Sequence, residues 1–229
     1  MYLVLLDAFH LDDLLFLGAL GRLMAAAPQP VVLIHGDGGL AARALEAKGY
    51  FPGDALSAEA LALVAAAHQQ QNRRLVGALT DAGIPAVGLL GSDRRMLVQT
   101  AGGEVLAGKA TWLGELVSRG AVPVVAALAQ DGVAVPVPVP AAAALGALRE
   151  ALGGTVVVFT RTGHAGLGNP PETVADADAL TGYKADFADA GAAEMLAAGP
   201  LLVTSPPGFW AADGPKGTEI TPKSPNNAD

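Results

Sequence analysis

A five-residue segment, His35-Gly36-Asp37-Gly38-Gly39, stands between a short apolar run at Val31–Ile34 and a helix expected from Leu40 to about Lys48. Glycines let the backbone approach a ligand closely, and the N–H groups at a helix start carry partial positive charge. A strand, a glycine loop and a helix in this order can therefore hold an anion. The candidate substrate- or anion-binding residues are His35, Gly36, Gly38 and Gly39, with Asn72 as a further candidate.

Plainer interpretations of these residues stay open. The glycine loop can be a tight turn in which Asp37 caps the following helix. His35 can be a hydrogen-bonded structural residue at the end of its strand. Asn72 and its neighbour Arg73 can belong to a solvated helix face.

A glycine loop of this kind also occurs in α/β-hydrolases, which need a nucleophilic serine in a Gly-x-Ser-x-Gly turn. None of the five serines has that setting, so the hydrolase hypothesis fails. The absence of cysteine excludes disulfides, thiolate catalysis and Cys-based metal sites. Asp176 and Asp178 have no third ligand close by in the sequence, so we expect no metal site.

Composition limits the partners. With 22 acidic and 14 basic residues, the formal net charge is −8. Sequence-independent binding to nucleic acid depends on Lys and Arg, so we expect none. Apolar runs are short and fall below the roughly 18 residues that a membrane span needs, and no basic region followed by an apolar one opens the chain. We therefore expect a cytoplasmic protein that neither crosses nor binds a membrane.

Short β-branched runs alternate with longer segments rich in Ala and Leu, which is typical of a mostly parallel sheet covered on both faces. Pro-rich residues Asp131–Pro140 predict an edge strand or extended arm, because proline cannot donate to a strand ladder. The expected strands are Tyr2–Leu6, Val31–Ile34, Pro85–Leu90, Ala121–Leu128, Thr155–Thr160 and Leu201–Thr204; the expected helices are Leu11–Ala26, Leu40–Lys48, one or two within Ala58–Ala82, Lys109–Arg119, Ala141–Leu152 and Asp186–Ala198.

The order of several segments resembles the amino acid kinase family, and acetylglutamate kinases in particular. The resemblance covers about Pro30 to Thr160. It is carried by Val31–Gly38, by Asn72–Val76, by Ala82–Asp93, by Gly120–Ala126 with its Pro-Val-Val, and by Ala144–Thr160; Gly217–Ile220 adds a Gly-Thr pair.

This resemblance implies a three-layer αβα sandwich built on a mostly parallel central sheet. An N-lobe of about residues 1–135 would bind an acylated amino acid, and a C-lobe of about residues 136–222 would bind ATP, leaving residues 223–229 as a tail. Family members phosphorylate a carboxylate and are commonly homodimers.

The resemblance also shows where this chain departs from the family. The family's first lysine would stand where this chain has Asp7, and no lysine occurs before Lys48. An Asn-x-Asn-Ala-Asp element falls on Pro138–Ala142, and an expected aspartate is Arg161. The second lysine would fall on Asp186, with Lys184 two residues earlier as a candidate catalytic substitute. Arg161 and His164 are candidate anion contacts on the nucleotide side.

Phosphoryl transfer depends on cancelling the charge of the transferring oxygens. We therefore expect an acetylglutamate kinase-like protein of amino acid metabolism whose phosphoryl transfer is lost or much reduced. It would keep a small-ligand or regulatory role, as a homodimer or beside an active paralogue. The alternatives are an active Mg²⁺-ATP-dependent kinase of an N-acylated amino acid such as acetylglutamate or aminoadipate, and a purely structural interaction protein.

Overall fold

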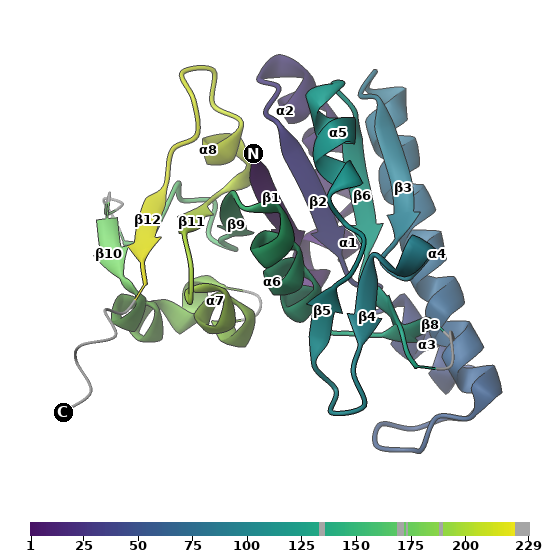
Figure 1. Ribbon diagram of the computed structural model, residues 1–229. Coiled ribbons are helices and arrows are strands. Elements are labelled where there is room, and N and C mark those ends of the chain that lie inside the picture. Colours follow the sequence, from purple (N-terminus) through teal and green to yellow (C-terminus); the bar gives the residue numbers. More distant parts are fainter. Residues whose placement is uncertain (133–135, 169–171, 173, 188–189, 223–229) are drawn as a thin grey trace.

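The computed structural model describes residues 1–132, 136–168, 172, 174–187 and 190–222. Its main sheet has the strand order β10-β12-β11-β9-β1-β2-β6-β3 (Figure 1). Neighbouring strands are parallel, apart from the antiparallel pair β11 and β12. The strands are β1 (Tyr2–Leu6), β2 (Val31–His35), β3 (Ala86–Leu90), β6 (Val122–Ala126), β9 (Thr155–Phe159), β10 (Val174–Asp176), β11 (Leu201–Thr204) and β12 (Thr218–Thr221).

A smaller sheet with the order β5-β4-β7-β8 extends the molecule beyond the ends of β3 and β6. Its strands are β4 (Leu97–Gln99), β5 (Val105–Ala107), β7 (Leu128–Gln130) and β8 (Pro136–Pro138). The Pro-rich strand β8 lies at the edge and pairs with β7 alone. The expectation of an edge strand in this segment is confirmed, since prolines at an edge remove no required hydrogen bond.

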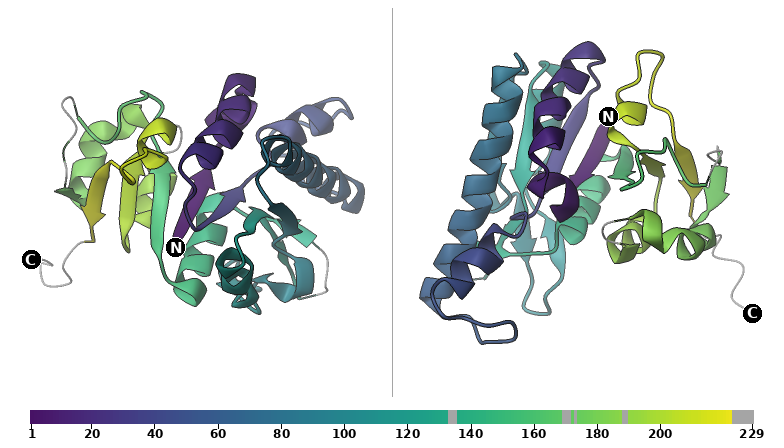
Figure 2. Two further views of the ribbon diagram at one scale, coloured as in Figure 1. Left: turned by 90° about the horizontal axis from the view of Figure 1, so that it is seen from above. Right: turned by 180° about the vertical axis from the view of Figure 1, so that it is seen from behind.

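Helices cover both faces of the main sheet, giving three layers (Figure 2). The long helix α4 and helix α2 lie on one face, and α5 and α6 lie on the other. The α-helices are α1 (Ala8–Asp12), α2 (Leu14–Ala26), α3 (Leu40–Glu46), α4 (Ala58–Asp81), α5 (Trp112–Ser118), α6 (Ala141–Leu152), α7 (Ala190–Leu196) and α8 (Pro206–Phe209); 3₁₀ turns are η1 (Asp93–Arg95) and η2 (Ala177–Asp186).

Alternate residues of the central strands feed two separate cores. In β1, Leu3 and Leu5 join the core under α5 and α6, whereas Val4 and Leu6 join the core under α2 and α4. All four side chains are at most 4% exposed. Burial on both faces explains why these strands are apolar throughout. The expected αβα sandwich with a mostly parallel sheet is confirmed.

Some boundaries differ from the sequence-based prediction. The single helix expected over Leu11–Ala26 is two helices, because Asp7 and Asp13 each cap a helix start: Asp7 accepts from the N–H of His10, and Asp13 from the N–H of Leu15. The uncertain segment Ala58–Ala82 is one helix. The helix expected over Asp186–Ala198 is shorter, and strands β4, β5, β10 and β12 were not anticipated.

The expected tail and the expected lobe boundary are not tested by the structure. The proposed tail, residues 223–229, lies outside the described residues, as do residues 133–135 of the Pro-rich arm. The lobe boundary near residue 136 remains a prediction. Within the described part of the chain, none of the helices has the length and apolar character needed to cross a membrane.

Candidate functional site

A cavity of about 890 Å³ opens where β1, β2 and β9 end. These strands are parallel, with Tyr2 opposite both Val31 and Thr155, so their carboxyl ends meet at one edge of the sheet. Ligands of open α/β sheets bind at this edge. The cavity is lined by Asp7–Phe9, the glycine loop at residues 36–39, part of α4, the segment 138–142, Arg161 and part of α7.

The glycine loop faces the cavity with Gly36, Gly38 and Gly39. Gly38 and Gly39 have φ values of 63° and 79°, in the left-handed region where a side chain would be strained. Asp37 Oδ2 accepts a hydrogen bond of 2.8 Å from the N–H of Ala41 in the first turn of α3, although the N-cap position itself is Gly39. The loop thus lines the cavity and also binds the first turn of α3 through Asp37.

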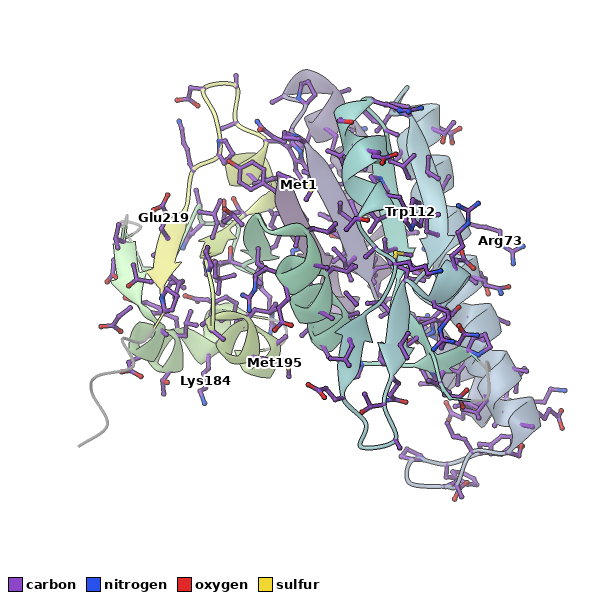
Figure 3. The ribbon with its side chains drawn as sticks, viewed as in Figure 1. Met1, Arg73, Trp112, Lys184, Met195 and Glu219 are labelled. Atoms are coloured by element: carbon purple, nitrogen blue, oxygen red, sulfur yellow. The ribbon has the colours of Figure 1, made fainter. Side chains whose placement is uncertain are left out.

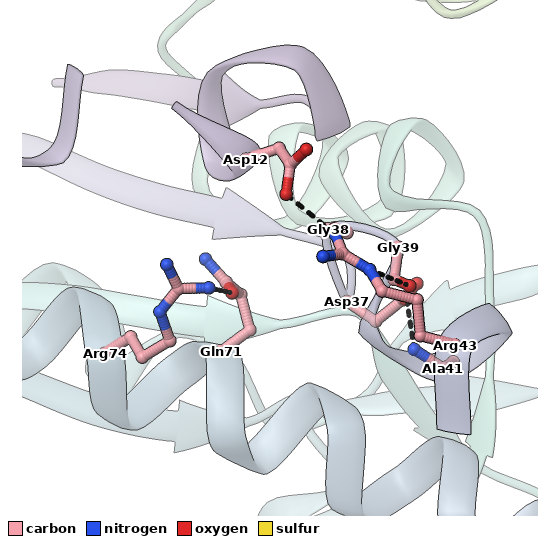
Figure 4. A network of polar contacts seen from close by, with 8 residues as sticks. All are labelled: Asp12, Asp37, Gly38, Gly39, Ala41, Arg43, Gln71 and Arg74. Atoms are coloured by element: carbon pink, nitrogen blue, oxygen red, sulfur yellow. Dashed lines mark hydrogen bonds and ion pairs between the residues drawn. The ribbon is translucent and has the colours of Figure 1, made fainter. Parts of the chain in front are cut away.

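Arg43 fastens the loop to the neighbouring helix α1, as Figure 4 shows. Its guanidinium donates to the carbonyls of Gly38 and Gly39 at 3.3 and 3.2 Å, and it contacts Asp12 Oδ1 at 2.7 Å. This hydrogen bond and the charge of Arg43 lower the pKa of Asp12. Both side chains are exposed, so we expect the pair to position the loop more than to stabilise the fold.

His35 is placed differently from what anion binding requires. Its side chain is completely buried and is not among the residues that line the cavity. Nδ1 donates to the carbonyl of Gly36 at 2.6 Å, and Nε2 lies 3.0 Å from Asn72 Nδ2. Burial is the main cause that lowers the pKa of His35 to about 4. The ring is therefore neutral at neutral pH, and the candidacy of His35 as an anion contact stays a prediction.

Asn72 lies on the buried face of α4, not on a solvated face. Its Nδ2 is 2.8 Å from the carbonyl of Val124, 3.3 Å from that of Leu89 and 3.0 Å from His35 Nε2. These acceptors belong to β6, β3 and β2, so one amide ties three strands to the helix. Asn72 also lies outside the cavity lining, and its candidacy as a ligand contact stays a prediction.

Asp7 follows β1 directly and lines the cavity, at the position where the family resemblance would have a lysine. Its Oδ1 accepts from both the backbone N–H and Nδ1 of His10, at 3.0 and 2.8 Å. The Asp7 side chain is 9% exposed and that of His10 is 5% exposed. A largely buried carboxylate with a histidine partner thus lines this end of the cavity.

The remaining candidates are scattered. Arg161 lines the cavity and lies over the ring of Phe9, with 5.3 Å between the guanidinium carbon and the ring centroid. His164 is exposed, and its carbonyl accepts from Thr160 Oγ1. Lys184 is exposed in η2 and points outward from the molecule (Figure 3). Among the described residues that line the cavity, Arg161 is the sole Lys or Arg.

Two features of α4 were not recognised from the sequence. His68 is 3% exposed and lines the cavity, although the sequence shows it only as part of a polar stretch. Gln71 lies beneath Gly38; its Oε1 accepts from Arg74, while its buried Nε2 has no hydrogen-bond partner among the described residues (Figure 4). His68 and Asn72 are four residues apart, so they share one helix face. This four-residue spacing is the sequence feature that could have indicated that His68 and Asn72 face the same way.

The segment Pro138–Ala142 brings apolar atoms to the cavity, where the family resemblance implies amides and a carboxylate. Pro140 precedes α6 and provides no side-chain cap for it. Within the described residues, no three His, Asp or Glu side chains lie close enough together to hold a metal ion. The cavity therefore presents two carboxylates, one guanidinium and an imidazole on largely apolar walls.

No family model matches the chain. An acetylglutamate kinase from Roseiflexus sp. (strain RS-1) is 35% identical to it over 167 residues, which cover 65% of this chain and 63% of that protein. An acetylglutamate kinase from Roseiflexus castenholzii is also 35% identical, over 66% of this chain and 64% of its own length. The chain thus spans less than two thirds of the length of these curated relatives.

Solved structures share the fold at lower identity. Aspartate kinase from Synechocystis is 17% identical with a TM-score of 0.70, over 97% of this chain and 40% of that chain. An isopentenyl phosphate kinase is 17% identical with a TM-score of 0.65, over 96% of this chain and 100% of that chain. At these identities the likeness concerns the fold alone.

Proposed function

The chain is acetylglutamate kinase-like and has the amino acid kinase fold, and from this premise we propose that it acts in amino acid metabolism with phosphoryl transfer lost or much reduced. It retains the cavity at the carboxyl ends of β1, β2 and β9 as a small-ligand site. Its role is regulatory, as a cytoplasmic homodimer or beside an active paralogue.

The observation that carries the proposal is the charge of the cavity. A transferring phosphoryl group spreads negative charge over three oxygens, and enzymes of this chemistry meet it with cations and backbone N–H groups. Here the described lining offers one guanidinium, that of Arg161, and two carboxylates, those of Asp7 and Asp37. The net charge of −8 adds to the repulsion of a polyphosphate.

The size of the rate losses expected from missing donors also supports a loss of phosphoryl transfer. Loss of one preorganised donor commonly lowers the rate by about 10²–10³. Losses in one site are not additive, so they cannot be multiplied. Lys184 lies outside the described cavity lining, and the residues that are present do not suit Mg²⁺-ATP. The donor set therefore supports binding of a small organic ligand better than it supports transfer.

The alternative is a working kinase in which Arg161 and Lys184 replace the missing lysines with Mg²⁺-ATP. Arg161 favours it, because this guanidinium does line the cavity. That enzyme would form the acyl phosphate of an N-acylated amino acid.

Trapping of acyl phosphate by hydroxylamine separates the two functions. With Mg²⁺-ATP and N-acetyl-L-glutamate, we expect hydroxamate to form at least about 10³-fold more slowly than the 1–100 per second typical of kinases. Thermal shift measurements with each compound alone report on binding in the same samples.

Lys184→Ala is the test variant, and Lys48→Ala is its matched control, since Lys48 is an exposed lysine after α3 and outside the cavity lining. Turnover near one per second that disappears in Lys184→Ala and persists in Lys48→Ala would establish the kinase and overturn our proposal.

A further inference from the structure

We propose that Arg43, Gln71 and Arg74 form a binding site for a single phosphate group between α1 and α4. None of the three is among the described residues that line the cavity, so this site is separate from the one already described. The inference goes beyond the proposed function and does not depend on it. It rests on an unpaired buried amide and on two guanidinium groups that lie beside it.

The amide of Gln71 carries the first step. The side chain is completely buried, and its Oε1 accepts a hydrogen bond of 3.0 Å from Arg74 Nη1. Its Nε2 is also buried and has no acceptor among the described residues. The opposite orientation of the amide is unfavourable, because it turns an N–H group toward a guanidinium that can only donate. A buried donor without an acceptor is unfavourable until a ligand supplies one.

Arg43 and Arg74 place positive charge beside this amide. Arg74 uses only Nη1 in its hydrogen bond to Gln71. Arg43 uses Nε and Nη2 for its contacts, so each guanidinium keeps N–H groups without an acceptor in the part of the chain that the structure describes. Gly38 brings the groups together: it accepts from Arg43, and a Cβ placed on it would lie 3.6 Å from Gln71 Cδ. In Figure 4 the unpaired nitrogens of all three side chains lie on the side that faces Asp12.

The carboxylate of Asp12 marks the place that an anion can take. Its Oδ1 contacts Arg43 Nη2 at 2.7 Å. This hydrogen bond is the main cause that lowers the pKa of Asp12, followed by the charge of Arg43, and the charge of Arg74 acts in the same direction. An oxygen held by Arg43 therefore lies within the field of both arginines. The Asp12 side chain is 64% exposed, so it can turn into solvent and give up this place.

The donors select a tetrahedral oxyanion. Two guanidinium groups and one amide come from separate side chains and can meet three oxygens on one central atom, whereas a carboxylate offers two oxygens. Guanidinium groups also match phosphate geometry through paired hydrogen bonds. The net charge of −8 opposes any anion at long range, so binding must come from these local donors. The ligand class is inorganic phosphate or a phosphomonoester.

Arg43 connects this site to the cavity. Its guanidinium donates to the carbonyls of Gly38 and Gly39 at 3.3 and 3.2 Å, and both glycines line the cavity. A phosphate bound to Arg43 competes with Asp12 and with these carbonyls for the same N–H groups. The site therefore suits an effector whose binding changes the contacts of the glycine loop.

Titration with inorganic phosphate tests the inference. Calorimetry and NMR follow binding to the full chain at neutral pH, with chloride at the same ionic strength as the reference, because salt screens exposed charges. We expect saturable binding at or below about 10 mM, with shifts of the Gln71 side-chain NH₂ signals and of the Gly38 and Gly39 amide signals. The absence of saturable binding, or equal shifts in chloride, overturns the inference.

Two further ligands define the anion. Glycerol phosphate that binds more tightly than inorganic phosphate identifies a phosphomonoester as the ligand, and weaker binding identifies the free ion. Acetate should bind at least about tenfold more weakly than phosphate, because it has two oxygens and a single charge. Equal binding of acetate overturns the assignment of a phosphate site.

Matched variants identify the residues. Arg74→Gln and Gln71→Leu should each weaken phosphate binding by about tenfold, since each removes a donor group. Arg73→Gln is the control, because Arg73 is the adjacent, exposed arginine of α4 and carries the same charge without belonging to the proposed site. Asp12→Asn removes the competing charge and should tighten phosphate binding by about tenfold. Equal affinities of Arg74→Gln and Arg73→Gln overturn the inference, even if Gln71→Leu fails to fold.

Arg161→Gln separates this site from the cavity, because Arg161 belongs to the described cavity lining. We expect this variant to bind phosphate as the wild type does. Binding that is lost in Arg161→Gln and kept in Arg74→Gln would place the ion in the cavity and overturn the inference. Acyl phosphate formation in the hydroxamate assay overturns the proposed function alone, since it does not depend on phosphate binding between α1 and α4.

Discussion

Replacement of Asn72 by alanine is expected to lower the free energy of unfolding by about 2–4 kcal/mol. The side chain is 6% exposed, and the two N–H donors of its amide lie within hydrogen-bonding distance of acceptors on β2, β3 and β6. Truncation would remove the amide donor from the buried ring nitrogen of His35 and from the strand carbonyls, and it would leave a small cavity. Urea unfolding followed by circular dichroism measures the change.

Gln70→Ala is the matched control for this variant. Gln70 lies on the same helix two residues earlier and is exposed, so its truncation should change the free energy of unfolding by about 0.5 kcal/mol or less. Equal stability of Asn72→Ala and Gln70→Ala would contradict the role that we assign to the buried amide.

Acidification from pH 6.5 to pH 4 is expected to remove about 3 kcal/mol of stability through His35 alone. Burial lowers the pKa of His35 from 6.5 to about 4; the nearby His68 lowers it further, while the Gly36 carbonyl and Asp37 act in the opposite direction. Below pH 6.5, His35 is protonated in the unfolded chain but stays neutral in the folded chain. The free energy of unfolding therefore falls with pH until the folded state is protonated near pH 4.

Urea unfolding at a series of pH values measures this slope, and His35→Gln isolates it from other titrating groups. In the variant the loss between pH 6.5 and pH 5 should be smaller than in the wild type, since the buried imidazole is gone. His164→Gln, at an exposed histidine, should keep the wild-type slope. Identical slopes for the wild type and His35→Gln would show that His35 is not the group responsible.

Much of the fold follows from local sequence patterns. The apolar strands and the helices between them predict a parallel sheet covered on both faces, and the prolines of β8 predict an edge strand. The hairpin of β4 and β5 escaped prediction because each strand has three residues, too few for a periodic pattern. The boundary between α1 and α2 at Asp13 was not predicted, because an aspartate that caps a helix cannot be told in sequence from an acidic residue inside the first turn.

The candidate site could be predicted only in part. The glycine loop was recognised from its residues, and it does line the cavity with Gly36, Gly38 and Gly39. His35 and Asn72 were each expected as candidate substrate or anion contacts; in the structure they contact each other, His35 contacts the carbonyl of Gly36, and Asn72 contacts two strand carbonyls. Whether such residues meet a ligand or the sheet depends on which helix face is turned inward, and that is set by packing between distant segments.

By itself, the sequence determined which chemical groups this protein has: strands that must be buried on both faces, no cysteine, and Asp7 at the position where the family resemblance implies a lysine. Only the tertiary structure decided where those groups point. It brought Asp7, Asp37 and His68 from three separate elements to one cavity, and it placed Lys184 on the outside. The physical reason is that residue type is a local property, whereas exposure and hydrogen bonding arise from contacts between segments far apart in the chain.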